Sequence, residues 1–245
     1  MAEGRSVVEW FGKTELLGGA LFVCGGSEKD VTERTVYGSR AEWLEGRRGG
    51  LGASDCGIVL GVSNFKTPLQ LWREKIGAVE TKEISGNERI DFGNRAEEPL
   101  REMFRLMHLE YELSFEPYLI VRQTGRYSFL TCTPDGELVE RETGRRGIYE
   151  SKTATCLSRA DWDKWRGKIP DLYYAQICEQ MFTGEYDYAV VWALLVNAEG
   201  DGEIRFYKFE KAECQTDIDY IIPKLEHFWK NNVLNGVPPA AILRL

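Results

Sequence analysis

The feature that most constrains the fold is a nearly unbroken apolar run at residues 187–196, Asp-Tyr-Ala-Val-Val-Trp-Ala-Leu-Leu-Val. A short run without alternating polar residues is typical of a β-strand that is buried on both faces. Such a strand requires packing layers on both sides of its sheet. The turn sequence Glu-Gly-Asp-Gly at 199–202 then predicts a partner strand that continues through Phe209. We therefore expect an α/β protein with a sheet at its centre.

Capping and proline signals predict helices around this sheet. Ser39 with Glu42 and Ser85 with Glu88 have the spacing of capping boxes. Pro99 is expected to kink or break the helix that contains it, because proline has no N–H to donate in a helix. The predicted helices are a short one that begins at Ser39, and others from Thr67 to Gly77, from Ser85 to about His108, from Pro170 to about Gly184 and over about 213–235. Further strands are predicted at 115–122 and 127–133.

The chain shows no internal repeat, low-complexity tract or convincing linker. Residues 1–38 mix short apolar runs with glycines and charges, and we interpret them as an N-terminal extension of unclear role. Residues 39–245 are interpreted as one domain, a central mixed sheet flanked by helices.

Composition limits the classes of function. A net charge of −8 does not suggest a general nucleic-acid binder, whose surface is basic. Basic clusters at 47–48, 145–146 and 164–168 fit a protein that grips DNA inside one groove, and equally fit ordinary solvated surface. Six cysteines without Cys-x-x-Cys spacing argue against a zinc ribbon or disulfide scaffold and favour a reducing compartment, the cytoplasm of a host cell. No apolar run approaches the ~20 residues of a membrane span.

A polar stretch at residues 133–153 carries the candidate chemistry. It opens with Thr-Pro-Asp135-Gly-Glu and closes with Ile-Tyr-Glu150-Ser-Lys152-Thr. Side chains alternate along a strand, so Glu150 and Lys152 point to the same face. Two paired strands would bring Asp135 to the same patch, which suits a metal ion and a phosphodiester. Glu-x-Lys triplets and Pro-Asp-Gly turns are also common by chance, so this stretch alone leaves a purely structural role open.

Five motifs follow one another in a characteristic order over about residues 39–240. Each motif is weak alone, and together they resemble the YqaJ-like viral recombinase family, the lambda-exonuclease branch of the PD-(D/E)XK nucleases. They are Trp43-Leu-x-x-Arg47-x-Gly-Gly-Leu-Gly-Ala-Ser54-Asp55 with Leu60-Gly61 and Thr67-Pro-Leu-x-Leu-Trp72; Gly93-x-x-x-Glu97 with Leu100-Arg101 and Met103-Phe104; Thr133-Pro-Asp135-Gly with Glu150-Ser-Lys152; Tyr174-Ala-Gln176; and Phe228-Trp229 with Gly236-Val-Pro.

The resemblance implies a restriction-endonuclease-like PD-(D/E)XK fold and a DNA exonuclease, typically acting 5′→3′ on linear duplex ends in phage-type recombination. By the same resemblance, Glu97, Asp135 and Glu150 would be acidic metal ligands, and the Ser151 carbonyl would add another. Lys152 would hold or activate the attacking water.

Three further roles come from the resemblance. Arg47 and Ser54 would contact the 5′ phosphate, and Gln176 would support the region of Lys152 and the water. A planar guanidinium suits a terminal phosphate because it makes bidentate contacts. The implied partners are double-stranded DNA ends, a single-strand annealing protein and further copies of the chain in a trimer, with no membrane partner.

The sequence departs from the family pattern at three places. Where the family has one Glu-Pro pair, this chain has Glu97-Glu98-Pro99, and the spacing from Gly93 favours Glu97 as the ligand. A second Gln often lies two residues after the Tyr-Ala-Gln motif, and Cys178 occupies that position. The segment between Asp135 and Glu150 is also longer than in compact members.

The residue types indicate the metal. Carboxylate and carbonyl oxygens, without a requirement for Cys or His, point to Mg²⁺ or Mn²⁺ rather than zinc. Such an ion neutralises the phosphate, lowers the pKa of a bound water and stabilises the leaving oxygen.

Other functions compete with the exonuclease. An endonuclease of the same superfamily would have the same motifs, and an end-blocked circular substrate would distinguish the two. A non-catalytic module that binds DNA ends would not need all four of Glu97, Asp135, Glu150 and Lys152. An iron–sulfur nuclease is disfavoured because its clustered cysteines are missing.

Overall fold

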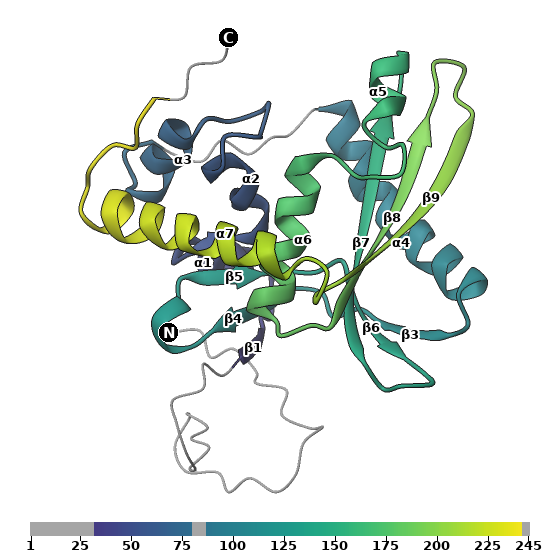
Figure 1. Ribbon diagram of the computed structural model, residues 1–245, viewed down its shortest axis with the longest axis horizontal. Coiled ribbons are helices and arrows are strands. Elements are labelled where there is room, and N and C mark those ends of the chain that lie inside the picture. Colours follow the sequence, from purple (N-terminus) through teal and green to yellow (C-terminus); the bar gives the residue numbers. More distant parts are fainter. Residues whose placement is uncertain (1–31, 80–86, 242–245) are drawn as a thin grey trace, which may run out of the picture.

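The computed structural model describes residues 32–79 and 87–241 and has an α/β architecture with two sheets (Figure 1). The larger sheet has the spatial order β3 (Tyr111–Ser114), β6 (Gly136–Glu140), β7 (Arg146–Thr155), β8 (Tyr188–Val196) and β9 (Gly202–Glu210). The smaller sheet has the order β1 (Thr32–Val36), β4 (Leu119–Gln123), β5 (Leu130–Cys132) and β2 (Leu51–Gly52). The larger sheet is mixed, because β7 and β8 are parallel and its other neighbours are antiparallel.

Helices cover the sheets and link them. Several start where the sequence predicted, since the side chains of Ser39 and Thr67 both accept the capping hydrogen bond of the following helix. The helices are α1 (Arg40–Arg48), α2 (Cys56–Val59), α3 (Pro68–Lys75), α4 (Glu88–Met107), α5 (Arg159–Asp163), α6 (Asp171–Thr183) and α7 (Gln215–His227), with short 3₁₀ turns η1 (Ala53–Asp55) and η2 (Gly125–Tyr127) and a π-helical turn η3 (Phe228–Leu234).

Strand β8 is buried on both faces, as its apolar run predicted. Tyr188, Val190 and Trp192 pack on the α4 side of the sheet. The alternate residues Ala189 and Val191 pack on the side of α6 and α7. This strand therefore joins two apolar cores, and in Figure 1 α4 passes behind the strands of the larger sheet while α6 lies to the left of β7.

The predicted central mixed sheet is present as the larger sheet, and the smaller sheet is a second one beside it. The predicted strand at 115–122 starts too early. Strand β3 ends at Ser114, a turn that contains Pro117 and Tyr118 follows, and β4 begins only at Leu119. Tyr118 has a φ of 64°, a left-handed conformation that interrupts a strand. The chain therefore leaves the larger sheet after β3 and enters the smaller one at β4.

The predicted N-terminal extension contributes one strand to the fold. Five residues of the segment 1–38 form β1, which pairs antiparallel with β4. Residues 1–31 lie outside the described residues, so a boundary at residue 38 and a single domain from residue 39 stay predictions.

The expected break at Pro99 does not occur. Helix α4 is continuous from Glu88 to Met107, and Asn87 is its N-cap. The predicted start at Ser85 lies outside the described residues. Ala96, Leu100 and Phe104 pack on the same core on either side of the proline. Tertiary packing thus holds the helix together although one backbone hydrogen bond is lost.

Phe104 fixes α4 to the sheet, and we expect Phe104→Ala to lower the free energy of unfolding by about 3–5 kcal/mol. Its ring is fully buried and lies 5.0 Å from the ring of Tyr149 and 5.5 Å from that of Trp192. The control Leu106→Ala removes a side chain from the same helix that is 79% exposed, and should change stability by less than about 0.5 kcal/mol. Urea unfolding of both variants measures the difference; equal losses would contradict this packing.

Candidate active site

Three carboxylates approach one another from three different elements. Glu97 lies on α4, Asp135 in the turn between β5 and β6, and Glu150 on β7. Their charges interact: Asp135 and Glu150 both raise the pKa of Glu97, and Asp135 raises that of Glu150. The charges of Asp135 and Glu150 thus act on one another and on Glu97 of α4, which supports the patch predicted from residues 133–153.

The backbone register explains the position of Asp135. The pairing of β6 with β7 ends at the pair Gly136 and Tyr149, so β7 has no strand neighbour on this side beyond that point. The Asp135 carboxylate takes this place and accepts hydrogen bonds from the Ser151 amide at 2.9 Å and the Ser151 hydroxyl at 3.0 Å. Because the N–H and C=O of a strand residue point to the same edge, the Ser151 carbonyl is directed to this open edge too.

Glu150 is a buried carboxylate, 1% exposed, held between β7 and α6. Its Oε2 accepts from Lys152 Nζ at 2.5 Å and from Gln176 Nε2 at 2.9 Å. Its Oε1 accepts from Gln180 Nε2 at 2.5 Å. A buried charge is tolerated only when it is paired and hydrogen-bonded, and these contacts meet that condition.

Lys152 remains an ammonium group in this setting. Burial by itself lowers its pKa, but the carboxylates of Glu150 and Asp135 outweigh burial and hold the pKa of Lys152 above its ordinary value. Its Nζ also lies 5.1 Å from the centroid of the Tyr173 ring, a cation–π contact. Lys152 is therefore placed to donate hydrogen bonds rather than to take up a proton.

Glu97 and Glu98 occupy different environments. Burial, and then repulsion from Asp135, raises the pKa of Glu97 to about 7. Glu98 is exposed to solvent. Only Glu97 thus faces the other two carboxylates, which supports the choice made from its spacing to Gly93.

The donor set suits a divalent cation with oxygen ligands. Carboxylates that raise one another's pKa gain from a positive charge between them. Within the described residues, no group of three or more Asp, Glu, His or Cys is already gathered as an assembled metal centre. Asp135 and Glu150 direct oxygens to Ser151 and to Lys152 instead, so these side chains would have to adjust when an ion binds.

Two further residues belong to this region, and the motif comparison gave them no role. Gln180 binds Glu150, and its position is one helical turn after Gln176, a spacing that already places both on one face of a helix. Arg101 is 7% exposed, its Nη1 lies 3.4 Å from the Asp135 carbonyl oxygen and 4.0 Å from Glu97 Oε2, and it covers the Phe115 ring. The signal in the sequence was an arginine four residues after Glu97, a spacing that puts both side chains on one face of a helix.

Arg47 and Ser54 form a second polar cluster around Gly52. A Cβ atom on Gly52 would lie 3.4 Å from Arg47 Nη2, and 3.9 Å from both Ser54 Oγ and Asp55 Oδ2. Burial lowers the pKa of Arg47, which Asp55 partly opposes. Asp55 is already paired with Lys75 Nζ at 2.8 Å and accepts from the Gly52 amide. The Arg47 guanidinium, stacked on the Trp43 ring, is thus suited to an anion from outside.

The two clusters lie near the same end of strands β2 and β5 in the smaller sheet. Strand β2 pairs parallel with β5, so the chain leaves both strands at the same end, towards Ser54 in one case and Asp135 in the other. Helix α6 packs on this end through α2. A Cβ atom on Gly57 of α2 would lie 2.4 Å from Leu172 Cδ1 and 3.2 Å from its Cα, so only glycine permits this close approach.

Comparison with known structures gives the class of fold. The alkaline exonuclease LHK-Exo from Laribacter hongkongensis matches 80% of this chain and 98% of its own, with 16% identity and a TM-score of 0.51. Its complex with dAMP matches 80% and 94%, with 17% identity and a TM-score of 0.53. The chain has the PD-(D/E)XK fold of these exonucleases.

The family follows from the sequence. The chain belongs to the YqaJ-like viral recombinase domain family, whose model matches residues 42–187. It is also 31% identical over 218 residues to the uncharacterized protein YqaJ of Bacillus subtilis strain 168, a match that covers 86% of this chain. The matched part spans 62% of that Bacillus protein. No helix among the described residues is long and apolar enough to cross a membrane.

Beside this site, Glu179 is a carboxyl group that burial holds in its neutral form. It is 1% exposed, its Oε1 accepts from Thr183 at 2.7 Å, and its Oε2 has no hydrogen-bond partner among the described residues. Burial, with Asp55 as a lesser cause, raises the pKa of Glu179 well above its ordinary value. The hydrogen bond from Thr183 opposes this shift.

We expect Glu179→Gln to stabilise the protein more at pH 8 than at pH 5. Above the ordinary Glu pKa of about 4.3, the unfolded chain releases the Glu179 proton while the folded chain keeps it. Wild-type stability therefore falls as pH rises, and the neutral amide removes this loss. Urea unfolding at both pH values measures the effect, with the exposed Glu213→Gln as control. A pH-independent difference between Glu179→Gln and the wild type would contradict a buried neutral acid.

Proposed function

We propose that this chain is a divalent-metal-dependent DNA exonuclease that acts on linear duplex ends in phage-type recombination, with 5′→3′ polarity. The observation that carries the proposal is the approach of three carboxylates and one ammonium group at the open edge of β7. The fold of the alkaline exonucleases and the family of the chain support the same reaction class. The match covers 62% of the Bacillus relative, so the proposal concerns this chain and not the whole of that protein.

Each residue of the site has a distinct task in this proposal. Glu97, Asp135, Glu150 and the Ser151 carbonyl would hold Mg²⁺ or Mn²⁺. The bound ion supplies charge neutralisation at the phosphate and a lower pKa for water. Lys152, which keeps its proton, orients the attacking water and donates to the negative charge that develops on the phosphate.

The remaining residues position these groups. Gln176 and Gln180 hold the Glu150 carboxylate from α6, and so fix the distance between β7 and that helix. Arg101, buried between Glu97 and the Asp135 backbone, holds these two acidic residues in position relative to each other. Loss of such supporting contacts typically weakens a metal site 10–100-fold.

The Arg47 cluster would bind the end of the DNA. The Arg47 guanidinium, which forms no ion pair within 4.0 Å among the described residues, and the neighbouring Ser54 hydroxyl offer several donors to a 5′ phosphate. The proposed partners are duplex ends, a single-strand annealing protein and two further copies of the chain, and the proposed location is the host-cell cytoplasm.

The same site would serve an endonuclease, which is the second candidate because the carboxylates and Lys152 do not depend on a free DNA end. The Arg47 cluster favours the exonuclease, since a terminal phosphate is its best ligand. A module that only binds DNA ends is the third candidate, and the buried Glu150 network argues against it.

With Mg²⁺ or Mn²⁺, the purified protein should digest 5′-phosphorylated linear duplex DNA and leave covalently closed circular DNA intact. Lys152→Ala should reduce the rate by about 10²–10³-fold or more, because it removes a donor aimed at the developing charge. Release of nucleotides measures the rate, and circular dichroism confirms that the variant is folded. An intact linear substrate would refute the nuclease; nicked circles would indicate the endonuclease.

Glu97→Gln and Glu98→Gln form a matched pair that tests the assignment of the metal ligand. The first substitution should lower nuclease activity by about 100-fold or more, since even supporting residues of a metal site are worth 10–100-fold. The second changes an exposed neighbour and should leave activity within about twofold. Isothermal titration with Mn²⁺ gives a readout independent of turnover. Equal effects of the two substitutions would contradict the assignment.

Arg47→Ala should raise KM for 5′-phosphorylated ends by about 10–100-fold, the equivalent of a lost charge-assisted hydrogen bond worth about 1.5–3 kcal/mol. The same variant should act on 5′-hydroxyl ends as the wild type does. Arg48→Ala is the control, because Arg48 is exposed and paired with Glu45 at 2.6 Å. If Arg47→Ala affects both kinds of end equally, Arg47 does not read the phosphate.

A further inference from the structure

A basic segment follows directly after β7, the strand that carries Glu150 and Lys152. The α5 segment, residues 156–170, joins β7 to α6 and contains helix α5. Lys164, Arg166 and Lys168 are all exposed, whereas Trp165 and Ile169 between and after them are 3% exposed each. The apolar residues thus anchor the segment, and the basic side chains point outwards.

Both ends of the α5 segment are attached to residues of the proposed active site. At its start, only Thr153, Ala154 and Thr155 separate Lys152 from the segment. At its end, α6 begins and Tyr173 reaches the Lys152 ammonium. The α5 segment is therefore close to Lys152 at both of its ends.

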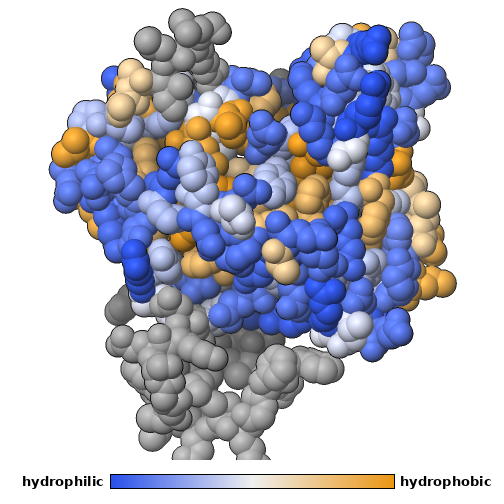
Figure 2. Space-filling model, in the orientation of Figure 1, coloured by the Kyte–Doolittle hydropathy of each residue, from blue (hydrophilic) through white to orange (hydrophobic). Residues whose placement is uncertain are grey.

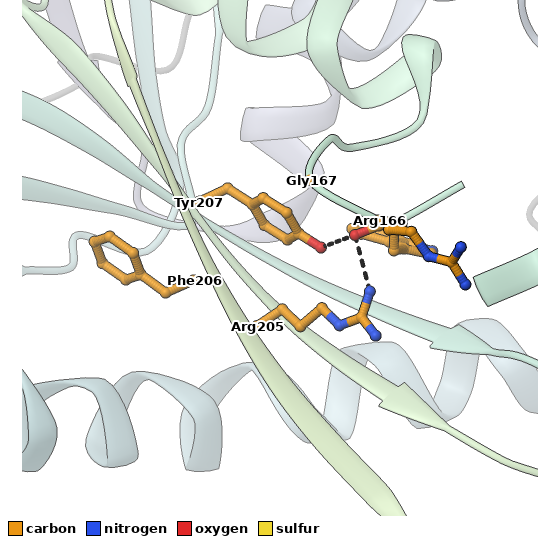
Figure 3. A pocket seen from close by; sticks show the side chains of 6 residues that line it. Arg166, Gly167, Arg205, Phe206 and Tyr207 are labelled. Atoms are coloured by element: carbon orange, nitrogen blue, oxygen red, sulfur yellow. Dashed lines mark hydrogen bonds between the residues drawn. The ribbon is translucent and has the colours of Figure 1, made fainter. Parts of the chain in front are cut away.

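The segment is held firmly against β9. The Trp165 carbonyl oxygen accepts hydrogen bonds from Arg205 Nη1 at 2.9 Å and from the Tyr207 hydroxyl, as the dashed lines in Figure 3 show. The Trp165 ring lies 5.7 Å from the ring of Tyr173. These contacts fix the position of the exposed cations relative to Lys152.

The cations are available to an incoming anion. Lys164 pairs with Asp161 at 2.9 Å and Arg166 pairs with Asp163 at 3.0 Å, but both basic side chains are more than half exposed, at 57% and 69%. Exposed ion pairs of this kind contribute only about 0–1 kcal/mol, so a phosphate can replace the carboxylate. For Lys168 no ion pair or hydrogen bond occurs within the described part of the chain.

The chemistry of the segment favours a duplex over a single strand. Sites for single strands combine cations with exposed aromatic rings on which bases stack. Here the Trp165 ring is buried, and the Trp162 ring is covered by the Arg205 guanidinium at 5.3 Å. The segment therefore offers exposed positive charge more than exposed aromatic surface, which suits a phosphate backbone.

We propose that Lys164, Arg166 and Lys168 contact the phosphate backbone of the duplex that is still uncut, next to the scissile end. This inference rests on the proposed function. In Figure 2 the α5 segment forms a hydrophilic projection at the upper right, and the surface is hollowed between it and the part over α2 and α3. In this proposal the duplex lies along the hollow, against the α5 segment.

The test compares two triple variants that remove the same charge. In K164A/R166A/K168A, the dependence of log Kd on log salt for a 5′-phosphorylated duplex should weaken by about 2.7, or about 0.9 for each lost phosphate contact. Affinity at low salt should fall by about tenfold or more. The control R141A/K224A/K230A removes three exposed cations elsewhere and should behave as the wild type. Fluorescence anisotropy in EDTA measures binding without digestion.

The outcomes separate this inference from the proposed function. A wild type that digests linear duplex, with a salt dependence that K164A/R166A/K168A leaves unchanged, overturns this inference alone. A loss of affinity for a single strand of equal length, with duplex binding unchanged, overturns the assignment to the duplex. Equal losses in both triple variants would reduce the effect to net charge and also overturn it. A wild type that neither binds nor digests DNA overturns the proposed function and this inference together.

Discussion

The burial of the Glu150 carboxylate is the constraint on which the site depends. A charge inside the protein must be paired and fully hydrogen-bonded, or it destabilises the fold by several kcal/mol. Lys152 on the same strand supplies the charge, and Gln176 and Gln180 on α6 supply the remaining donors. The distance between β7 and α6 is therefore set by the residues that hold the centre of the site, so that stability and the arrangement of reactive groups have one origin.

Helix α6 extends this constraint to the other polar cluster. One part of the helix binds Glu150, while its first turn packs on α2 at the contact between Leu172 and Gly57. The short α2 follows directly on Ser54 and Asp55, whose neighbour in space is Arg47. Helix α6 thus connects the carboxylates of the candidate active site to the cluster proposed to bind a terminal phosphate. The α5 segment, which precedes α6 and follows β7, inherits the same fixed position.

Much of this arrangement could be predicted from local sequence signals. The apolar run at 187–196, the caps at Ser39 and Thr67, and the alternation of Glu150 and Lys152 each reflect a short-range rule with a definite period or position. The division into two sheets could not be predicted from such signals, because it depends on the turn at Tyr118, which directs the chain out of the larger sheet after β3. The break expected at Pro99 does not occur for a related reason. Packing of Leu100 and Phe104 against the core outweighs the local preference of proline to end the helix. Helical spacing predicts that Gln180 lies on the same face as Gln176, but only the structure shows that Gln180 donates a hydrogen bond to Glu150.

The sequence by itself determined the α/β class, the family and the residue types of the site, because motifs and periodicities are properties of neighbouring residues. It left Glu97 and Glu98 almost equivalent, since adjacent glutamates on a helix differ only in the direction they face. In the tertiary structure the charges of Asp135 and Glu150 act on Glu97, while Glu98 is exposed to solvent, and this difference supports the proposal of Glu97 as the ligand. The tertiary structure also decided that Lys152 stays charged, because its pKa depends on carboxylates that the fold, and not the sequence order, brings beside it.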